Sequence, residues 1–143
     1  MIEMSGKYLI TIDGAQAYDN DQDSVSLSTI GEFSRQDDKF FISFKESAAT
    51  GYEGDTTSLE IESDKKVTLN RRGVSNTQLI IERGQRHYSH YGTDFGGAML
   101  GVRADSIENN LSDSGGKLNL RYSLDINANL LSYNSLDITV KEI

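Results

Sequence analysis

Apolar and polar residues alternate along almost the whole chain. Alternation with a period of two is typical of β-strands, because successive side chains point to opposite faces of a sheet. In residues 117–126 the even positions from Leu118 to Ile126 are apolar or aromatic, and the odd positions are polar or charged. The pattern predicts strands at residues 7–13, 24–35, 39–46, 56–63, 66–72, 78–83, 86–91, 98–107, 117–126 and 135–142.

These strands are joined by segments rich in Gly, Asn, Asp and Ser, and no stretch has the pattern of a long amphipathic helix. Residues 105–111 are compatible with a single helical turn, and the phase break at Gly31 predicts a β-bulge. Many strands with one apolar face form a sandwich or a closed barrel, and closure is favoured because it hides strand edges. We therefore expect residues 1–143 to form one all-β domain, a single antiparallel β-barrel of about eight to ten strands.

Charge and composition narrow the classes of partner. The chain has 22 acidic and 14 basic residues and a net charge of −8, which argues against a nucleic-acid groove or an anionic membrane surface. It contains no cysteine, which excludes disulfides, cysteine-based zinc sites and thiol catalysis. Glu3 stands where a secretory signal needs positive charge, and no apolar run approaches the roughly 20 residues of a membrane span. We expect a cytoplasmic protein with no nucleic-acid or membrane partner.

Two charged residues fall on faces that are otherwise apolar. Glu46 shares a face with Phe44, and Arg71 shares a face with Val67 and Leu69. A charge inside a small barrel is costly unless it is paired or faces a wet cavity. Three alternatives follow: the two residues pair with each other, they bind a polar ligand near the barrel mouth, or they are exposed at their strand ends.

Two tyrosines are further candidates for ligand binding. Tyr122 lies on the apolar face of the most regular strand, and Tyr91 precedes a Gly-rich loop. Each could offer its hydroxyl to a ligand, or be a core residue whose hydroxyl bonds to backbone. The histidines, His87 and His90, would point to opposite faces of a strand and could not chelate one metal. We expect no metal site and no cofactor.

Several short features follow one another in a fixed order from Glu46 to the end of the chain. They are Glu46, Gly51, the strand Thr56-Thr57-Ser58-Leu59-Glu60-Ile61, Arg71-Arg72-Gly73 as an Arg-x-Gly motif, Tyr91-Gly92-Thr93-Asp94-Phe95-Gly96, and Leu120-Arg121-Tyr122-Ser123-Leu124. With these features the chain resembles the YwiB-like bacterial proteins, a family of unknown function. Asp94 stands where the family usually has proline. The resemblance implies a calycin-like (lipocalin-like) β-barrel and supplies no catalytic residue.

The favoured hypothesis for function is a non-catalytic barrel that binds a small, partly apolar ligand in its interior or mouth. It rests on analogy with calycins, because a barrel of about eight strands either holds one small ligand or is filled by its own side chains. The alternative is a protein-interaction or regulatory module with a solid barrel core, which could form a homodimer. Exposed side chains at Phe41, Tyr52 or Tyr133 would indicate such a module. An enzyme would need a polar cleft that joins Glu46, Arg71 and a tyrosine, and no Gly-x-Ser-x-Gly motif occurs.

Overall fold

The computed structural model describes residues 7–18, 21–47, 53–73, 76–90 and 99–143. These residues form ten strands and no helix, which confirms the predicted all-β class. The strands are β1 (Tyr8–Tyr18), β2 (Asp21–Gln36), β3 (Lys39–Lys45), β4 (Thr56–Glu62), β5 (Lys66–Arg72), β6 (Asn76–Glu82), β7 (Arg86–His90), β8 (Met99–Ser112), β9 (Gly115–Ile126) and β10 (Asn129–Glu142).

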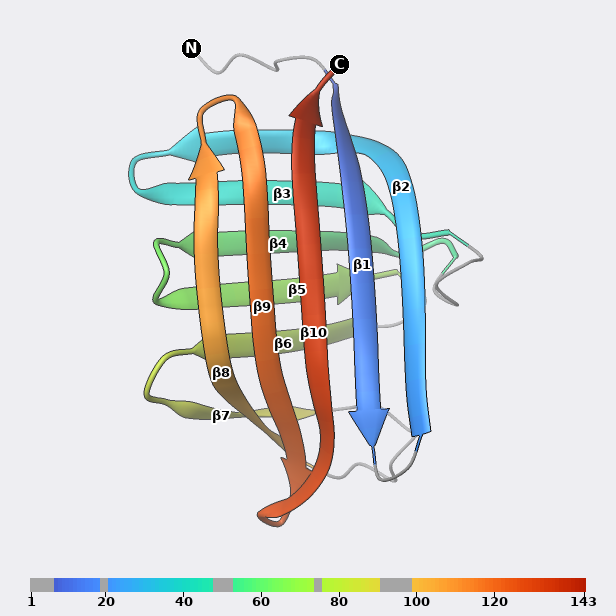
Figure 1. Ribbon diagram of the computed structural model, residues 1–143, viewed down its shortest axis with the longest axis vertical. Helices are drawn as coiled ribbons and strands as arrows, with labels where there is room; N and C mark the ends of the chain where they lie inside the picture. The colour runs from blue at the N-terminus through green and yellow to red at the C-terminus, as the bar shows by residue number, and fades with distance from the viewer. Residues whose placement is uncertain (1–6, 19–20, 48–52, 74–75, 91–98) are drawn as a thin grey trace.

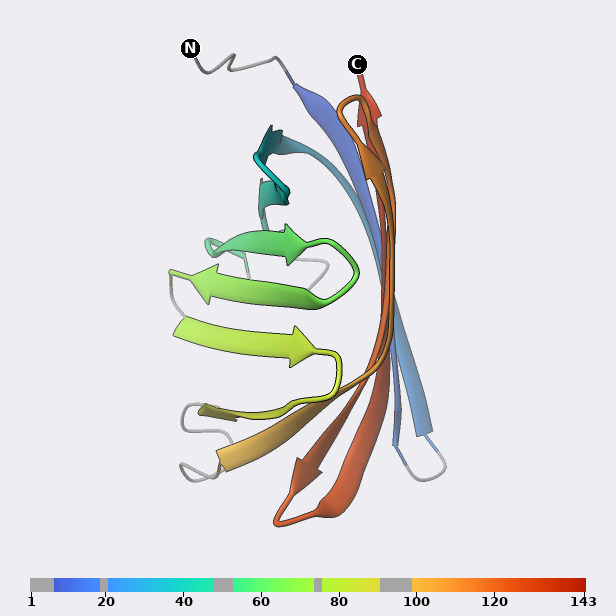
Figure 2. The ribbon, with the colours of Figure 1, turned by 90° about the vertical axis from the view of Figure 1, so that its left-hand side faces the viewer.

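The strands form one antiparallel sheet in the order β6-β5-β4-β3-β2-β1-β10-β9-β8-β7. Figures 1 and 2 show that the sheet curls on itself: the long strands β1, β2, β8, β9 and β10 make one wall, and the shorter strands β3–β7 cross behind them. The first and last strands are neighbours, since Tyr8 pairs with Glu142 and Ala17 with Tyr133. The result is the predicted single barrel, closed except for the seam between β6 and β7.

Gly31 marks the corner at which β2 passes from one wall to the other. Up to Gly31 the strand pairs with β1, and from Glu32 it pairs with β3, so the strand changes its partner without the predicted bulge. A Cβ atom at Gly31 would lie 2.5 Å from both Ile10 Cδ1 and the Ser43 carbonyl oxygen. The phase break in the sequence therefore reflects a bend that brings two walls close together, which only glycine permits.

The seam between β6 and β7 is closed mainly by side chains. Within the described ranges, an isolated backbone bridge joins Glu82, at the end of β6, to Gln85, which precedes β7. Beyond it, the Ser89 hydroxyl donates to the Gln78 carbonyl oxygen at 2.6 Å, and His87 Nε2 lies 2.8 Å from Glu82 Oε1. The hydrogen bond with His87 lowers the pKa of the Glu82 carboxyl below its usual value.

The barrel core consists of the inward residues that the alternation predicts. Ile10, Ile42, Ile61, Val67, Leu118 and Leu120 are fully buried. The predicted helical turn at residues 105–111 is wrong, because β8 runs through it with a β-bulge between Ala104 and Ser106. An extra residue in a bulge shifts the alternation, which explains why this strand looked irregular in the sequence.

Candidate ligand-binding cavity

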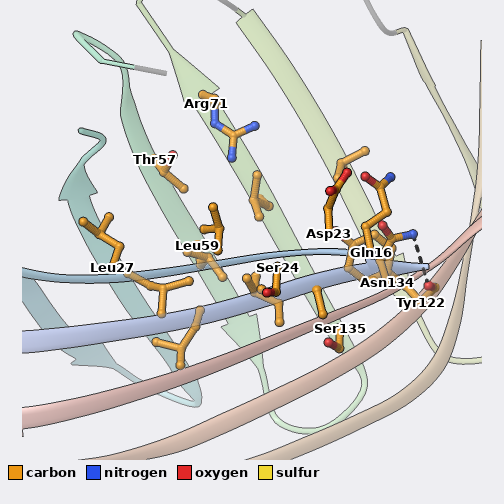
Figure 3. A pocket seen from close by; sticks show the side chains of 18 of the residues that line it. Gln16, Asp23, Ser24, Leu27, Thr57, Leu59, Arg71, Tyr122, Asn134 and Ser135 are labelled. Carbon is orange, nitrogen blue, oxygen red and sulfur yellow. Dashed lines mark hydrogen bonds between the residues drawn. The ribbon is translucent and has the colours of Figure 1, made fainter. Parts of the chain in front are cut away.

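The barrel interior holds a cavity of about 500 Å³. It lies between the wall of β1, β2, β9 and β10 and the crossing strands β3–β6 (Figure 3). Leucine, isoleucine, valine and phenylalanine side chains make much of its lining, and polar groups occupy two places. The residues around it are Ile12, Gly14, Ala15, Gln16, Asp23, Ser24, Val25, Leu27, Phe44, Glu46, Thr57, Leu59, Leu69, Arg71, Leu79, Leu100, Tyr122, Leu124, Leu131, Asn134, Ser135, Leu136 and Ile138.

The first polar place is an ion pair at the ends of β3 and β5. Arg71 Nε lies 3.5 Å from Glu46 Oε2, and the side chains of Glu46 and Arg71 are 4% and 17% exposed. The Thr57 hydroxyl, on β4 between them, donates to the same Glu46 oxygen. The Glu46 backbone N–H donates to the Asp55 carbonyl at 2.9 Å, which fixes the strand end that carries the carboxylate. The predicted pairing is present, and the alternative of full exposure is wrong.

This pair places two charged groups at the rim of the cavity. Because the charges of Glu46 and Arg71 are opposite, together they add little net charge. The buried Glu46 carboxylate contacts the Arg71 guanidinium and accepts a hydrogen bond from the Thr57 hydroxyl, which together offset the cost of burying a charge. Figure 3 shows the guanidinium of Arg71 extending from β5 toward the space between the walls. A ligand in the cavity would meet a polarised but nearly neutral surface here.

The second polar place lies on the opposite wall, near the C-terminal end of β1 and the N-terminal end of β10. The Gln16 amide donates to the Ser132 hydroxyl at 3.3 Å, and the Asn134 amide donates to the same oxygen at 3.0 Å. Asp23 adds a carboxylate on this side, where it accepts a 2.7 Å hydrogen bond from the Tyr18 hydroxyl. That hydrogen bond raises the pKa of Tyr18 above its ordinary value. Asp23, Glu46 and Arg71 are the charged residues in the described lining, which therefore carries a net charge of about −1 at neutral pH.

Three of the four ligand-binding residues proposed from the sequence line the cavity. They are Glu46, Arg71 and Tyr122, and Tyr122 is half-buried on the inner face of β9. Tyr91 lies outside the described residues. Whether any of the four binds a ligand stays a prediction.

The sequence pattern missed the second polar place. Gln16 lies beyond the predicted end of the first strand at residue 13, and Ser132 and Asn134 precede the predicted start of the last strand at residue 135. In β10 a register shift between Leu130 and Ser132 breaks the alternation that would have shown the strand continuing. Polar residues inside a barrel also weaken the apolar signal on which the prediction depends.

The described part of the chain has neither a cluster of metal ligands nor a helix that could span a membrane. No group of three or more His, Cys, Asp or Glu side chains there is placed to hold a metal ion. The same residues include no helix with the length and apolar character to cross a membrane. Of the residues proposed for an interaction surface, Tyr133 is exposed and Phe41 is half-buried, while Tyr52 lies outside the described ranges.

The fold and the cavity define a nearly closed antiparallel β-barrel with a partly apolar interior space. Residues 10–138 match the family described as a domain of unknown function, DUF1934, and the chain belongs to that family. Its fold is similar to the crystal structure of ywiB protein from Bacillus subtilis, with a TM-score of 0.79 and 16% identity over 96% of this chain and 92% of that chain. No curated protein matches the sequence.

Proposed function

We propose that the barrel is a non-catalytic, cytoplasmic binding protein for a small, partly apolar molecule. The observation that carries this proposal is the interior cavity of about 500 Å³. That volume falls within the range of pockets that enclose small organic ligands, roughly 300–1,000 Å³. A barrel whose side chains filled its lumen would leave no such space.

The lining supports a ligand with an apolar body and a polar end. Leu59, Leu69, Leu79 and Leu124 offer apolar surface, whose burial by a ligand is favourable by roughly 25 cal/mol per Å². The Glu46–Arg71 pair and the Gln16–Asn134 group offer hydrogen bonds at separate places. Because the lining carries a net negative charge, a neutral or singly cationic molecule is favoured over an anion.

Val25 gives the proposal a selective test. Its side chain lines the cavity from β2 and is 38% exposed, so a larger residue there would extend into the space without disturbing the packed core. Leu130 on β10 is 54% exposed and is not part of the lining, which makes it a matched control. The variants are Val25→Trp and Leu130→Trp.

The experiment has two readouts. Native mass spectrometry of gently purified protein is compared with the mass after denaturation, and the neutral probe N-phenyl-1-naphthylamine is titrated against each variant. We expect an excess mass that is lost on denaturation, saturable probe binding, and at least a tenfold loss of probe affinity in Val25→Trp but not in Leu130→Trp. Absence of both excess mass and saturable binding, or equal probe binding in the two variants, would overturn the proposal.

A further inference from the structure

In the described part of the chain, the first part of β2 has one edge that pairs with no strand. Residues 21–31 pair with β1 on one side, whereas β3 pairs only with Glu32–Gln36. Among the described residues, no strand pairs with the other edge of residues 21–31. Figure 1 shows this part of β2 at the margin of the long-stranded wall, below the bend where the strand crosses over. Its backbone N–H and C=O groups on that edge are a template for a further strand.

The middle of this edge lacks the features that usually protect an exposed strand. Residues 24–30 read Ser-Val-Ser-Leu-Ser-Thr-Ile, with no charge, proline or glycine. Two of its apolar residues are exposed: Val25 by 38% and Ile30 by 50%. Ile30 also lies beside Leu9, its partner on β1, which is 36% exposed. The β6–β7 seam, in contrast, is covered by side-chain contacts such as His87–Glu82.

We propose that this edge pairs with the same edge of a second copy of the chain. The two β2 strands would run antiparallel about a two-fold axis at Leu27, which joins the two long-stranded walls into one continuous sheet. The register places Ser24 opposite Ile30, Val25 opposite Thr29, Ser26 opposite Ser28 and Leu27 opposite Leu27 of the second copy. A two-fold, self-complementary contact is the commonest arrangement of soluble homodimers.

The absence of charge along residues 24–30 favours a second copy and sets this register. Each copy carries a net charge of −8, which opposes self-association, so two copies can pair only where they bring no like charges together. Centring the pairing on Leu27 places the seven uncharged residues 24–30 opposite one another and sets Asp23 opposite Gly31. A basic peptide strand would find no carboxylate along these residues to select it.

The first test measures oligomeric state. Ser26→Lys/Ser28→Lys places like charges directly opposite one another in the proposed dimer, whereas in the monomer the positive charge at position 26 would lie beside Asp13, which Ser26 contacts now. Ser34→Lys/Ser114→Lys adds the same charge at two other exposed sites. Light scattering over a concentration series should show wild type and control approaching twice the monomer mass. The dissociation constant should rise at least tenfold in the edge variant. A monomer at all concentrations, or a dimer insensitive to the edge variant, would overturn the proposal.

The second test reads the register directly and does not depend on the lysine variants. The chain has no cysteine, so Ser26→Cys and Ser28→Cys each introduce a single thiol. Paired positions across an antiparallel contact lie within disulfide distance, about 4.4–6.8 Å between Cα atoms. Mild oxidation of an equimolar mixture should give the mixed disulfide in several-fold excess over either variant alone. Equal yields from all three samples would contradict the register, and binding of unrelated strands without self-association would assign the edge to another partner.

Discussion

Arg86 on β7 forms a two-point ion pair with Asp125 on β9 by passing over Gly101, which lies between them on β8. Arg86 Nε lies 3.1 Å from Asp125 Oδ2, and the second nitrogen contacts Oδ1. The same guanidinium donates to the Tyr88 hydroxyl at 2.7 Å and covers the Tyr88 ring. Because Gly101 has no side chain, the pair spans three strands and ties the short strand β7 to the long-stranded wall.

Substitution Gly101→Ala tests whether this pair stabilises the barrel. The new Cβ would contact the Arg86 guanidinium and the Asp125 carboxylate, and the flexible arginine would move away. We expect urea denaturation to show a lower free energy of unfolding. The cost should be smaller in an Asp125→Asn background, where no ion pair remains to be lost. Equal costs in both backgrounds would mean that the methyl group acts by packing alone.

The pH dependence of stability should change with Asp125. The Arg86 hydrogen bonds lower the pKa of the Asp125 carboxyl below its usual 3.8, although burial opposes this shift. The unfolded chain therefore takes up a proton at a higher pH than the folded chain does, so the stabilisation is complete above the unfolded-state pKa and is lost as pH falls through the folded-state pKa. In urea titrations between about pH 6 and pH 2.5, the free energy of unfolding should fall less steeply in Asp125→Asn than in wild type. Parallel curves would show that Asp125 titrates alike in both states.

The corner at Gly31 should be intolerant of a side chain. Gly31→Ala places a methyl group against Ile10 and the Ser43 carbonyl, and we expect a loss of about 1–3 kcal/mol in the free energy of unfolding. Gly14→Ala is a matched control on β1, where the nearest heavy atom to the new Cβ, Leu136 Cδ1, lies at an ordinary 3.7 Å. That control should change stability by no more than about 0.5–1 kcal/mol. Similar losses in both variants would contradict the packing argument.

The Glu46–Arg71 pair should matter more when it is broken than when it is absent. Arg71→Met leaves the Glu46 carboxylate, 4% exposed, without its cation, and a loss of about 3 kcal/mol is expected. Glu46→Gln/Arg71→Met removes both charges and should restore part of that loss. Chemical denaturation of the single and double variants measures the difference. A double variant less stable than Arg71→Met would show that the Glu46 carboxylate stabilises the fold through contacts other than Arg71, such as its hydrogen bond from Thr57.

The sequence predicted the barrel because the core residues obey a strict alternation. Ile42 and Phe44 on β3 and Leu118 and Leu120 on β9 are buried as the pattern requires. The same alternation placed Glu46 and Arg71 on inner faces, and from that the charge pair could be predicted.

The rest depends on where strands bend and shift, which alternation does not encode. The bulge after Ala104 disguised β8, and the shift before Ser132 hid the polar end of the cavity. The Arg86–Asp125 pair escaped prediction for another reason. Asp125 is buried although it follows the outward positions of β9 in the alternation, and its ion-pair partner Arg86 comes from β7, a strand distant in the sequence.

The pairing of β1 with β10 also sets the order of events when the chain is made. β1 is synthesised before the other described strands, whereas its neighbour β10 is synthesised after them, as the pairing of Tyr8 with Glu142 shows. Contacts between such distant segments form slowly because a long loop must close first. Until β10 has left the ribosome, β1 has only β2 to pair with, and the apolar inner faces of both strands stay open to solvent. Closure of this barrel therefore waits for β10, and the nascent chain is most exposed to aggregation before that strand is available.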